Sequence, residues 1–359
     1  MKKCLLFIPD ISGFTKFIQT TEVEHSQYVI AELLEVLLDA NTEGLLLAEI
    51  EGDALFFYKE EILSIEKLLA QIETMFTSFY SHLKLMEKNR ICPCKACSTA
   101  SELELKIVAH CGEIQFITVK DSRKPFGIEV IETHRLLKNS IPSANYTLLS
   151  STLAESIEMP GAYSSKLFKF EKGENEYDGK KLKYVYSVID QENLKLKPFD
   201  YAKKVVFKDT APIHIEKEFE ISAAELIEFI TNFKYRHQWV KGFDKLEFNE
   251  EEINQLGTEH ICVVNGKILN FITVTKDGKP GQFVYGEMTS DAPMIDEFYQ
   301  FYIITPLSTT SCKLDVECYW KVKSPIKKIL VSILAKNKLK KNLNSAIENL
   351  STFLKEKML

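Results

Sequence analysis

The stretch LLFIPDISGFTKFI, residues 5–18, decides how the N-terminal half of the chain is interpreted. It begins as an apolar run that predicts a buried strand over residues 3–9. Asp10 interrupts this run, and Gly13 and Thr15 follow shortly after it. A carboxylate where a strand turns, beside backbone N–H groups left accessible by a glycine, suits a divalent cation that holds a polyphosphate.

A second stretch, EIEGDALFFY at residues 49–58, predicts two strands around a tight turn at Gly52 and Asp53. Two carboxylates at strand turns could hold two cations, which can activate an attacking oxygen and neutralise a leaving one. The alternative is that Asp10 and Asp53 are ordinary turn aspartates.

The composition of the whole chain sets broad limits. Its 359 residues, 45% of them hydrophobic, predict roughly two to three soluble domains. The net charge of −6 argues against a general nucleic-acid binder. The start reaches Pro9 and Asp10 too early for a signal peptide, and no apolar run approaches the roughly 18 residues of a membrane span. We therefore expect a cytoplasmic protein whose eight cysteines are mostly reduced.

Strands and helices alternate through the first half, and this pattern predicts an α/β sandwich. Besides the stretches above, the pattern predicts helices over 24–41, 64–88 and 127–139, a strand pair over 103–119 that turns near Gly112, and a hairpin over 166–188.

A polar segment containing Pro198 predicts a linker at 191–205, between one domain at 1–190 and another at 206–359. The second domain opens with a predicted strand over 213–221. A helix over 222–233 follows, with the capping-box spacing from Ser222 to Glu225. Several alternating strands come next, and one long helix over 324–359 ends the chain.

The pair FIPDISGFTKFI and EIEGDALFFY resembles the catalytic domain of class III nucleotidyl cyclases, over roughly residues 1–190. The resemblance implies an α+β chain whose N-terminal domain is a ferredoxin-like α/β sandwich of nucleotidyl cyclase type. It implies that two Mg²⁺ or Mn²⁺ ions bind at the metal positions Asp10, Ile11 and Asp53. It further implies that the segment Gly13, Phe14 and Thr15 contacts the triphosphate of a nucleoside triphosphate. A homodimer is implied as well, because this family shares each active site between two domains.

Other family positions fall on Glu49, Lys124 and Arg135. Glu49 stands at a base-reading position and favours guanine, because a carboxylate can accept from the guanine N1–H and N2–H₂ groups. Lys124 stands at the second base-contacting position and matches neither the adenylyl nor the guanylyl pattern. Arg135 is the implied catalytic residue, which stabilises charge that develops on the phosphates.

Two positions depart from the family pattern. Ile131 stands where the family has an asparagine, and Asp178 stands where a lysine contacts phosphate, with Lys180 close by as a substitute. Loss of one pre-organised stabilising group can slow a reaction by about 10²–10³. The sequence therefore predicts nucleotide binding with little turnover.

The stretch CPCKAC, residues 92–97, places Cys92, Cys94 and Cys97 close together, with His110 and Cys111 downstream. Three thiolates and an imidazole could bind Zn²⁺. The alternative is a disulfide or ordinary thiols.

The second domain is rich in aromatic residues. Its order of strand, helix, strands and long helix resembles the START-like (SRPBCC) helix-grip family, in which a long C-terminal helix crosses a curved antiparallel sheet. The resemblance implies an apolar cavity for a hydrophobic small molecule or lipid, with Trp239 and Tyr285 near it. The alternative is a filled core.

Residues 321–359 contain ten lysines and two glutamates, and their apolar residues recur at helical spacing. A basic amphipathic helix suits peripheral contact with an anionic membrane. The alternative is a helix packed on the core with a solvated lysine face.

Taken together, the residues predict a divergent nucleotidyl cyclase-like signalling protein with at most slow cyclisation of GTP or ATP, fused to a domain that binds a hydrophobic ligand. The alternative is a catalytically inactive nucleotide or lipid sensor, or a lipid carrier.

Overall fold

The computed structural model describes residues 3–120, 122–161, 163–198, 204–250, 252–331 and 336–357. The chain forms two compact units: Met1–Glu87 with Thr99–Phe199, and Lys88–Ser98 with Asp200–Leu359. The short segment Lys88–Ser98 thus groups with the second unit although it interrupts the first in sequence, which the sequence analysis did not anticipate. Within the described residues, none of the helices has the combined length and apolar character that a membrane crossing requires.

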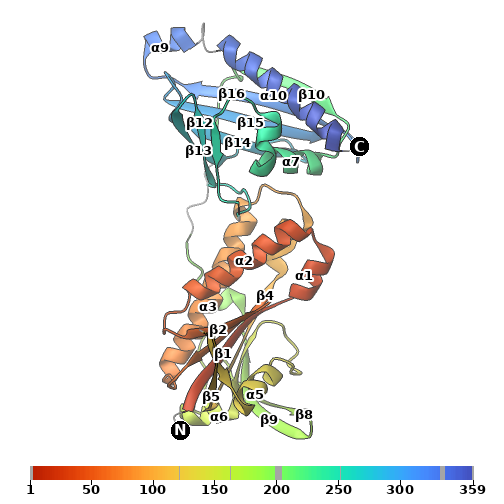
Figure 1. Cartoon of the computed structure of the whole chain (residues 1–359). Helices are drawn as coiled ribbons and strands as arrows, with labels where there is room; N and C mark the ends of the chain where they lie inside the picture. The colour runs from red at the N-terminus through yellow and green to blue at the C-terminus, as the bar shows by residue number, and fades with distance from the viewer. Residues whose placement is uncertain are drawn as a thin grey trace. The chain divides into compact units, whose positions relative to one another are not determined.

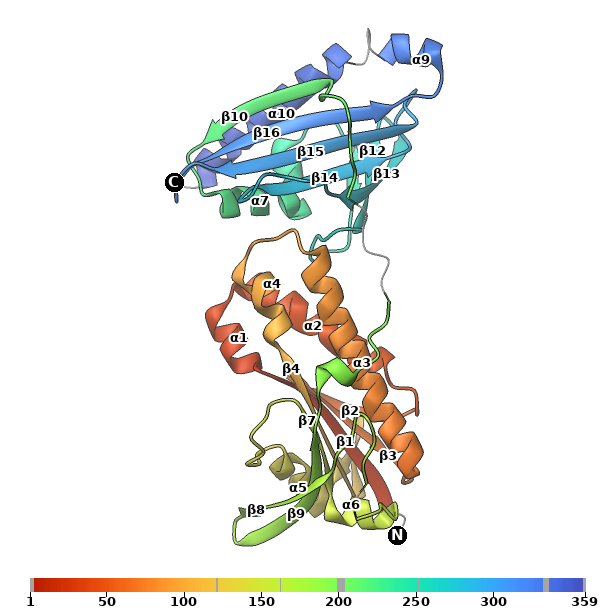
Figure 2. The same cartoon turned by 180° about the vertical axis from the view of Figure 1, so that it is seen from behind.

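The first unit is built on a seven-stranded sheet (Figures 1 and 2), in the order β2-β3-β1-β4-β7-β9-β8. Its strands are β1 (Lys3–Ser12), β2 (Leu46–Glu51), β3 (Ala54–Lys59), β4 (Glu104–Glu113), β7 (Tyr146–Ser150), β8 (Glu171–Tyr177) and β9 (Lys180–Val188). Among the strand pairs that the described residues form in this sheet, β4–β7 is parallel and the others are antiparallel. The mixed α and β content agrees with the sequence prediction.

The helices described in this unit are α1 (Phe14–Thr20), α2 (Val23–Asp39), α3 (Ile65–Asn89), α5 (Ile128–Leu136) and α6 (Ser151–Ser156), whereas α4 (Lys95–Thr99) falls almost wholly in the segment Lys88–Ser98 of the second unit. Leu6 and Ile8 of β1 pack on one face of the sheet with Val130 of α5. Leu5 and Phe7 point to the opposite face, where α2 and α3 run beside the central strands, and they are fully buried. Because successive side chains of β1 point to opposite faces of the sheet, this strand contributes to the core on both sides.

Both strands predicted over 103–119 are present, but the prediction that they pair with each other is wrong. β4 and β5 (Gln115–Val119) follow one another but do not pair, and β5 instead pairs with β6 (Ser122–Phe126) in a separate two-stranded sheet. The reason is that β4 already pairs with β1 along its whole length and with β7 on its other edge. The first strand also runs beyond its predicted end, to Ser12.

The second unit has an antiparallel seven-stranded sheet in the order β10-β16-β15-β14-β13-β12-β11. The strands are β10 (Ile213–Phe219), β11 (Lys245–Glu247), β12 (Glu259–Val264), β13 (Lys267–Val274), β14 (Phe283–Thr289), β15 (Glu297–Pro306) and β16 (Cys312–Lys321). Its helices are α7 (Ala223–Thr231), α8 (Arg236–Trp239), α9 (Pro325–Leu330) and α10 (Lys336–Lys357). The predicted capping box of Ser222 and Glu225 is present at the start of α7.

The long C-terminal helix predicted over 324–359 is described as α9 and α10, and residues 332–335 and 358–359 lie outside the described part of the chain. α10 lies along the sheet (Figure 1), and Leu343, Ile347 and Leu350 are buried in the core beneath it. Its lysines from 338 onward are exposed. The alternative interpretation, a core-packed helix with a solvated lysine face, therefore describes α10.

A buried ion pair lies in the core of the second unit. Arg236 of α8 and Glu287 of β14 are both buried, and Arg236 Nη1 donates to Glu287 Oε2 at 3.1 Å. Tyr285 donates its hydroxyl to the same carboxylate at 2.5 Å. Burial alone would raise the pKa of Glu287, but the Arg236 charge overrides it and lowers that pKa to about 2. The carboxylate is thus held charged inside an apolar core.

We predict that Arg236→Met lowers the free energy of unfolding by about 3–5 kcal/mol, because it leaves the Glu287 charge buried without its partner. The loss should shrink as the pH falls from 7 towards 5. Without arginine the folded-state pKa of Glu287 lies above its unfolded value, so protonation of the folded state relieves the penalty. Denaturant titrations at several pH values measure this. Lys181→Met, which breaks the exposed pair with Glu174, is the control and should cost below about 1 kcal/mol. Equal losses in the two variants would contradict the prediction.

Candidate functional site

The two predicted metal aspartates lie close together at the first sheet, Asp10 in β1 and Asp53 in the turn that leads into the neighbouring strand β3. In the register of β1, Asp10 stands between Ala54 of β3 and Lys106 of β4. Asp53 occupies the turn between β2 and β3, and its backbone carbonyl accepts a hydrogen bond from the Ile11 amide at 3.0 Å. The structure therefore brings together residues that are far apart in the sequence.

Asp10, Asp53 and the segment that follows β1 line one pocket of about 500 Å³. Ile11, Ser12, Gly13, Phe14, Thr15 and Lys16 contribute to its wall, and so do Lys106, Asn139, Ser143 and Tyr146. Gly13 has a φ of 89°, in the left-handed region that glycine adopts without strain. This conformation lets the chain turn directly from β1 into α1 beside the pocket.

Burial disfavours ionisation of both carboxylates in the pocket. Burial raises the pKa of Asp10 to about 6; the Asp53 charge adds to this effect and Lys106 opposes it. Burial also raises the pKa of Asp53. Lys106 Nζ lies 3.3 Å from Asp10 Oδ1 and supplies one positive charge. The buried hydroxyl of Ser12 has no hydrogen-bond partner among the described residues.

This donor set fits the divalent cations that the sequence analysis named. Carboxylate, carbonyl and hydroxyl oxygens are the ligands that Mg²⁺ and Mn²⁺ prefer. A cation beside Asp10 and Asp53 would relieve the cost of ionising two partly buried carboxylates. Lys106 competes for the same position, because its ammonium group already neutralises Asp10 in part.

The two base-reading positions are also brought together. Glu49 of β2 and Lys124 of β6 form an ion pair, with Nζ 2.8 Å from Oε2. Neither residue lines the pocket at Asp10. The carboxylate that the sequence analysis predicts to read the base is therefore paired with the chain's own lysine.

The residues predicted to contact the transferring phosphate are likewise paired within the chain. Arg135 of α5 forms an ion pair with Asp178 in the β8–β9 turn. Lys180 of β9 forms an ion pair with Glu132 of α5. Ile131 is an exposed apolar side chain on the same helix. None of the pocket-lining residues at Asp10 and Asp53 comes from this group.

Sequence reasoning missed Lys106, Asn139 and Tyr146. The stretch LELKIVAH carried a signal, because Lys106 is a charged residue directly before the apolar run Ile107–Ala109 of a predicted strand. Asn139 and Tyr146 carried no such signal. The structure places them at the pocket, where Asn139 Nδ2 lies 2.6 Å from the Tyr146 hydroxyl.

The remaining predicted residues lie elsewhere. Trp239 and Tyr285 are 1% and 0% exposed and belong to the core of the second unit. His110, named as a zinc ligand, lies in β4 of the first unit, with Nε2 2.6 Å from Glu129 Oε2 and Nδ1 2.7 Å from the Ser150 hydroxyl. It is therefore engaged away from the cysteine segment.

Two comparisons of the sequence describe its relatives. Residues 30–146 match a family of proteins of unknown function, DUF2652. The uncharacterized protein Rv2561/Rv2562 of Mycobacterium tuberculosis is 33% identical over 129 residues, which is 36% of this chain and 60% of that protein. The chain thus spans less than two thirds of the curated relative that it matches.

Among solved structures, the guanylate cyclase domain of RhGC from Catenaria anguillulae in complex with GTP is similar at 14% identity and a TM-score of 0.37. The match covers 52% of this chain and 97% of the cyclase domain. A norcoclaurine synthase variant from Thalictrum flavum, in complex with a transition-state analogue, is similar at 16% identity and a TM-score of 0.33, over 41% of this chain and 95% of that one. Likenesses at these TM-scores carry no argument about function.

We predict that Lys106→Met binds Mn²⁺ at least about tenfold more tightly than the wild type, because the competing ammonium group is removed from Asp10. Isothermal titration with Mn²⁺ alone measures this. Lys124→Met removes the same charge outside the pocket and should leave Mn²⁺ affinity unchanged. Weaker binding in Lys106→Met than in Lys124→Met would show that the lysine supports the cation site rather than competing with it.

Proposed function

We propose that the first unit binds a nucleoside triphosphate together with Mg²⁺ or Mn²⁺ in the pocket at Asp10 and Asp53, and that it cyclises the nucleotide slowly or not at all. The observation that carries this proposal is the pairing of two partly buried carboxylates, both with raised pKa, beside the Ile11–Thr15 segment in one pocket.

Each group of residues has a distinct role in this proposal. Asp10 and Asp53 would hold the cations through carboxylate oxygens, with the Ile11 backbone beside them. The Gly13–Thr15 segment would contact the phosphates. Bound divalent cations supply neutralisation of phosphate charge and activation of the attacking hydroxyl. Glu49 would favour a guanine base only where its pair with Lys124 opens.

Arg135 and Lys180, the two positively charged residues proposed to contact phosphate, differ in how readily their ion pairs within the chain can open. Asp178 has an 80% exposed side chain, so its pair with Arg135 is an exposed one, worth about 0–1 kcal/mol. A triphosphate can outcompete such a pair. Glu132 is only 8% exposed, so removing Lys180 would leave a buried carboxylate without its partner. Arg135 is therefore available to a nucleotide, whereas Lys180 is held.

The homodimer implied by the cyclase resemblance gives Arg135 a route to the nucleotide. Arg135 lies outside the lining of the pocket that contains Asp10 and Asp53. In the proposed arrangement, a second copy of the chain supplies Arg135 to the nucleotide held by the first. The hydrophobic-ligand function implied by the START-like resemblance is not included, because Trp239 and Tyr285 fill the core.

We predict that GTP with Mn²⁺ raises the melting temperature of the wild-type protein and that Asp53→Ala abolishes the shift, since a ligand that binds only the native state stabilises it. Thermal denaturation with GTP, ATP and nucleotide-free Mn²⁺ measures this. Asp39→Ala removes an exposed aspartate at the end of α2 and should retain the full shift. An unchanged melting curve in the wild type at millimolar nucleotide would refute the proposal.

We predict a gain of turnover when Ile131→Asn and Asp178→Lys are combined. The first change supplies a hydrogen-bond donor, and the second adds a phosphate-binding charge and frees Arg135. Product formation by mass spectrometry should rise by at least about tenfold, given the 10²–10³ that one such group can contribute. Glu174→Lys makes the same charge change on β8 and should give no gain. Wild-type turnover of about 1–10³ s⁻¹, typical of enzymes, would show that these positions are wrongly assigned.

A further inference from the structure

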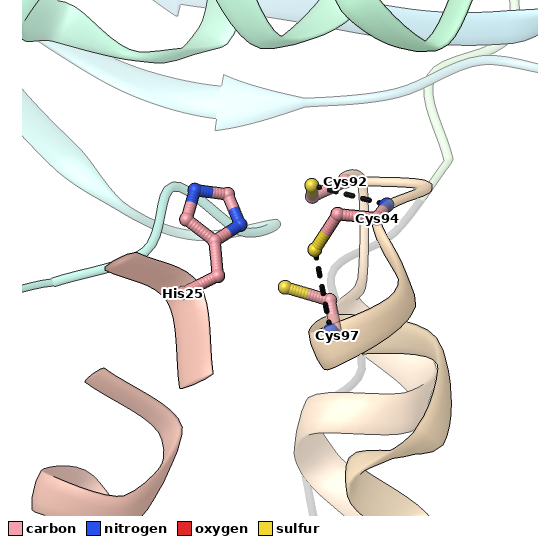
Figure 3. A group of neighbouring side chains, drawn as sticks. All are labelled: His25, Cys92, Cys94 and Cys97. Carbon is pink, nitrogen blue, oxygen red and sulfur yellow. Dashed lines mark hydrogen bonds between the residues drawn. The ribbon is translucent and has the colours of Figure 1, made fainter. Parts of the chain in front are cut away.

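The segment Lys88–Ser98 of the second unit brings three cysteine sulfurs together. The Sγ atoms of Cys92, Cys94 and Cys97 lie within 4.8 Å of one another, and Figure 3 draws the three side chains side by side. All three come from one stretch of six residues, so local backbone geometry is enough to assemble the group. His25, drawn in the same figure, belongs to the other unit, and the site proposed here is built from the three sulfurs.

Backbone N–H groups point at these sulfurs. The Cys94 amide donates to Cys92 Sγ at 3.4 Å, and the Cys97 amide donates to Cys94 Sγ at 3.3 Å (Figure 3). Hydrogen bonds from amides favour the charged form of the acceptor, so this geometry stabilises thiolates. α4 begins at Lys95, and the Ser98 amide donates to the Cys94 carbonyl at 3.0 Å, which fixes the turn.

Contacts within the second unit fix this segment. The Leu256 amide donates to the Asn89 carbonyl at 2.9 Å, and Ile91 packs against the core of the unit. Cys92 is 4% exposed, with its Sγ 3.8 Å from Glu228 Oε2 of α7. The sulfurs are therefore held in place before any ion arrives.

A disulfide does not account for the group. All eight cysteines lie in the described part of the chain, and each is a thiol there. A disulfide would also join only two of the three sulfurs, and the third sulfur would remain beside it.

We propose that Cys92, Cys94 and Cys97 bind one Zn²⁺ as thiolates. Thiolates are soft ligands that select Zn²⁺ over Mg²⁺ or Mn²⁺, so this site and the pocket at Asp10 take different ions. Binding releases the thiol protons to solvent, and the fourth coordination position is completed by a ligand from outside the segment. The ion ties the segment to a fixed geometry at the point where the chain passes between the two units.

Metal analysis of the full chain tests this proposal. Protein purified under reducing conditions, dialysed with Zn²⁺ and then freed of excess metal should retain one zinc per chain. Co²⁺ should give the sulfur-to-metal charge-transfer absorption of thiolate ligation. In the double variant Cys94→Ser with Cys97→Ser, affinity for zinc should fall by more than the 10–100-fold that losing a supporting contact costs. Cys262→Ser, a half-buried cysteine of β12, is the control and should retain the metal.

The proposal is overturned if wild-type protein retains no zinc and shows no thiolate–cobalt absorption. It is also overturned if the double variant binds zinc as tightly as the Cys262→Ser control. Because the serine variants can fail to fold, circular dichroism accompanies each measurement. A test on the wild-type protein alone avoids this problem: after a chelator has removed the metal, the protein must rebind one zinc per chain when Zn²⁺ is returned. A disulfide between two of the three cysteines, found by mass spectrometry in protein purified under reducing conditions, would likewise exclude the site.

Discussion

The pairing of β1 with β3 and β4 is the constraint on which the first unit depends. β1 is central in its sheet and buried on both faces, so its register admits no slip without moving apolar residues out of two cores. The same register sets Asp10 opposite Lys106 and next to the turn that carries Asp53. Core packing thereby fixes two carboxylates at one pocket. Their burial there raises the pKa of both.

The charged residues that the cyclase resemblance assigns to base or phosphate contact are paired within the chain. Each has a partner of opposite charge: Glu49 with Lys124, Arg135 with Asp178, and Lys180 with Glu132. Exposed pairs are weak and can open, whereas the Lys180–Glu132 pair includes a buried acid. In the proposed function, the aspartates therefore still bind the metal and nucleotide while these pairs weaken stabilisation of a transition state.

Local sequence signals foretold much of this structure, and long-range pairing accounts for what they missed. The apolar run of β1, the Gly52–Asp53 turn, the long helix α3 and the capping box at Ser222 each depend on neighbours in the chain, and all are present, although β1 extends past its predicted end. The pairing of β5 with β6, the insertion of β7 beside β4 and the grouping of Lys88–Ser98 with the second unit depend on distant segments. Lys106 was overlooked for the same reason, because its role appears only when β4 lies against β1. The nearness of Cys92, Cys94 and Cys97 was visible in the sequence, but the hydrogen bonds to their sulfurs were not.

The most direct measurement of the central claim is a crystal structure of the protein with Mn²⁺ and a non-hydrolysable GTP analogue, using the anomalous signal of manganese to locate the ion. The account predicts manganese bound to the carboxylates of Asp10 and Asp53, phosphate density along Gly13–Thr15, and Lys106 displaced from Asp10. A structure in which Lys106 still pairs with Asp10 and the nucleotide and manganese are absent from that pocket, at concentrations well above millimolar, would contradict it.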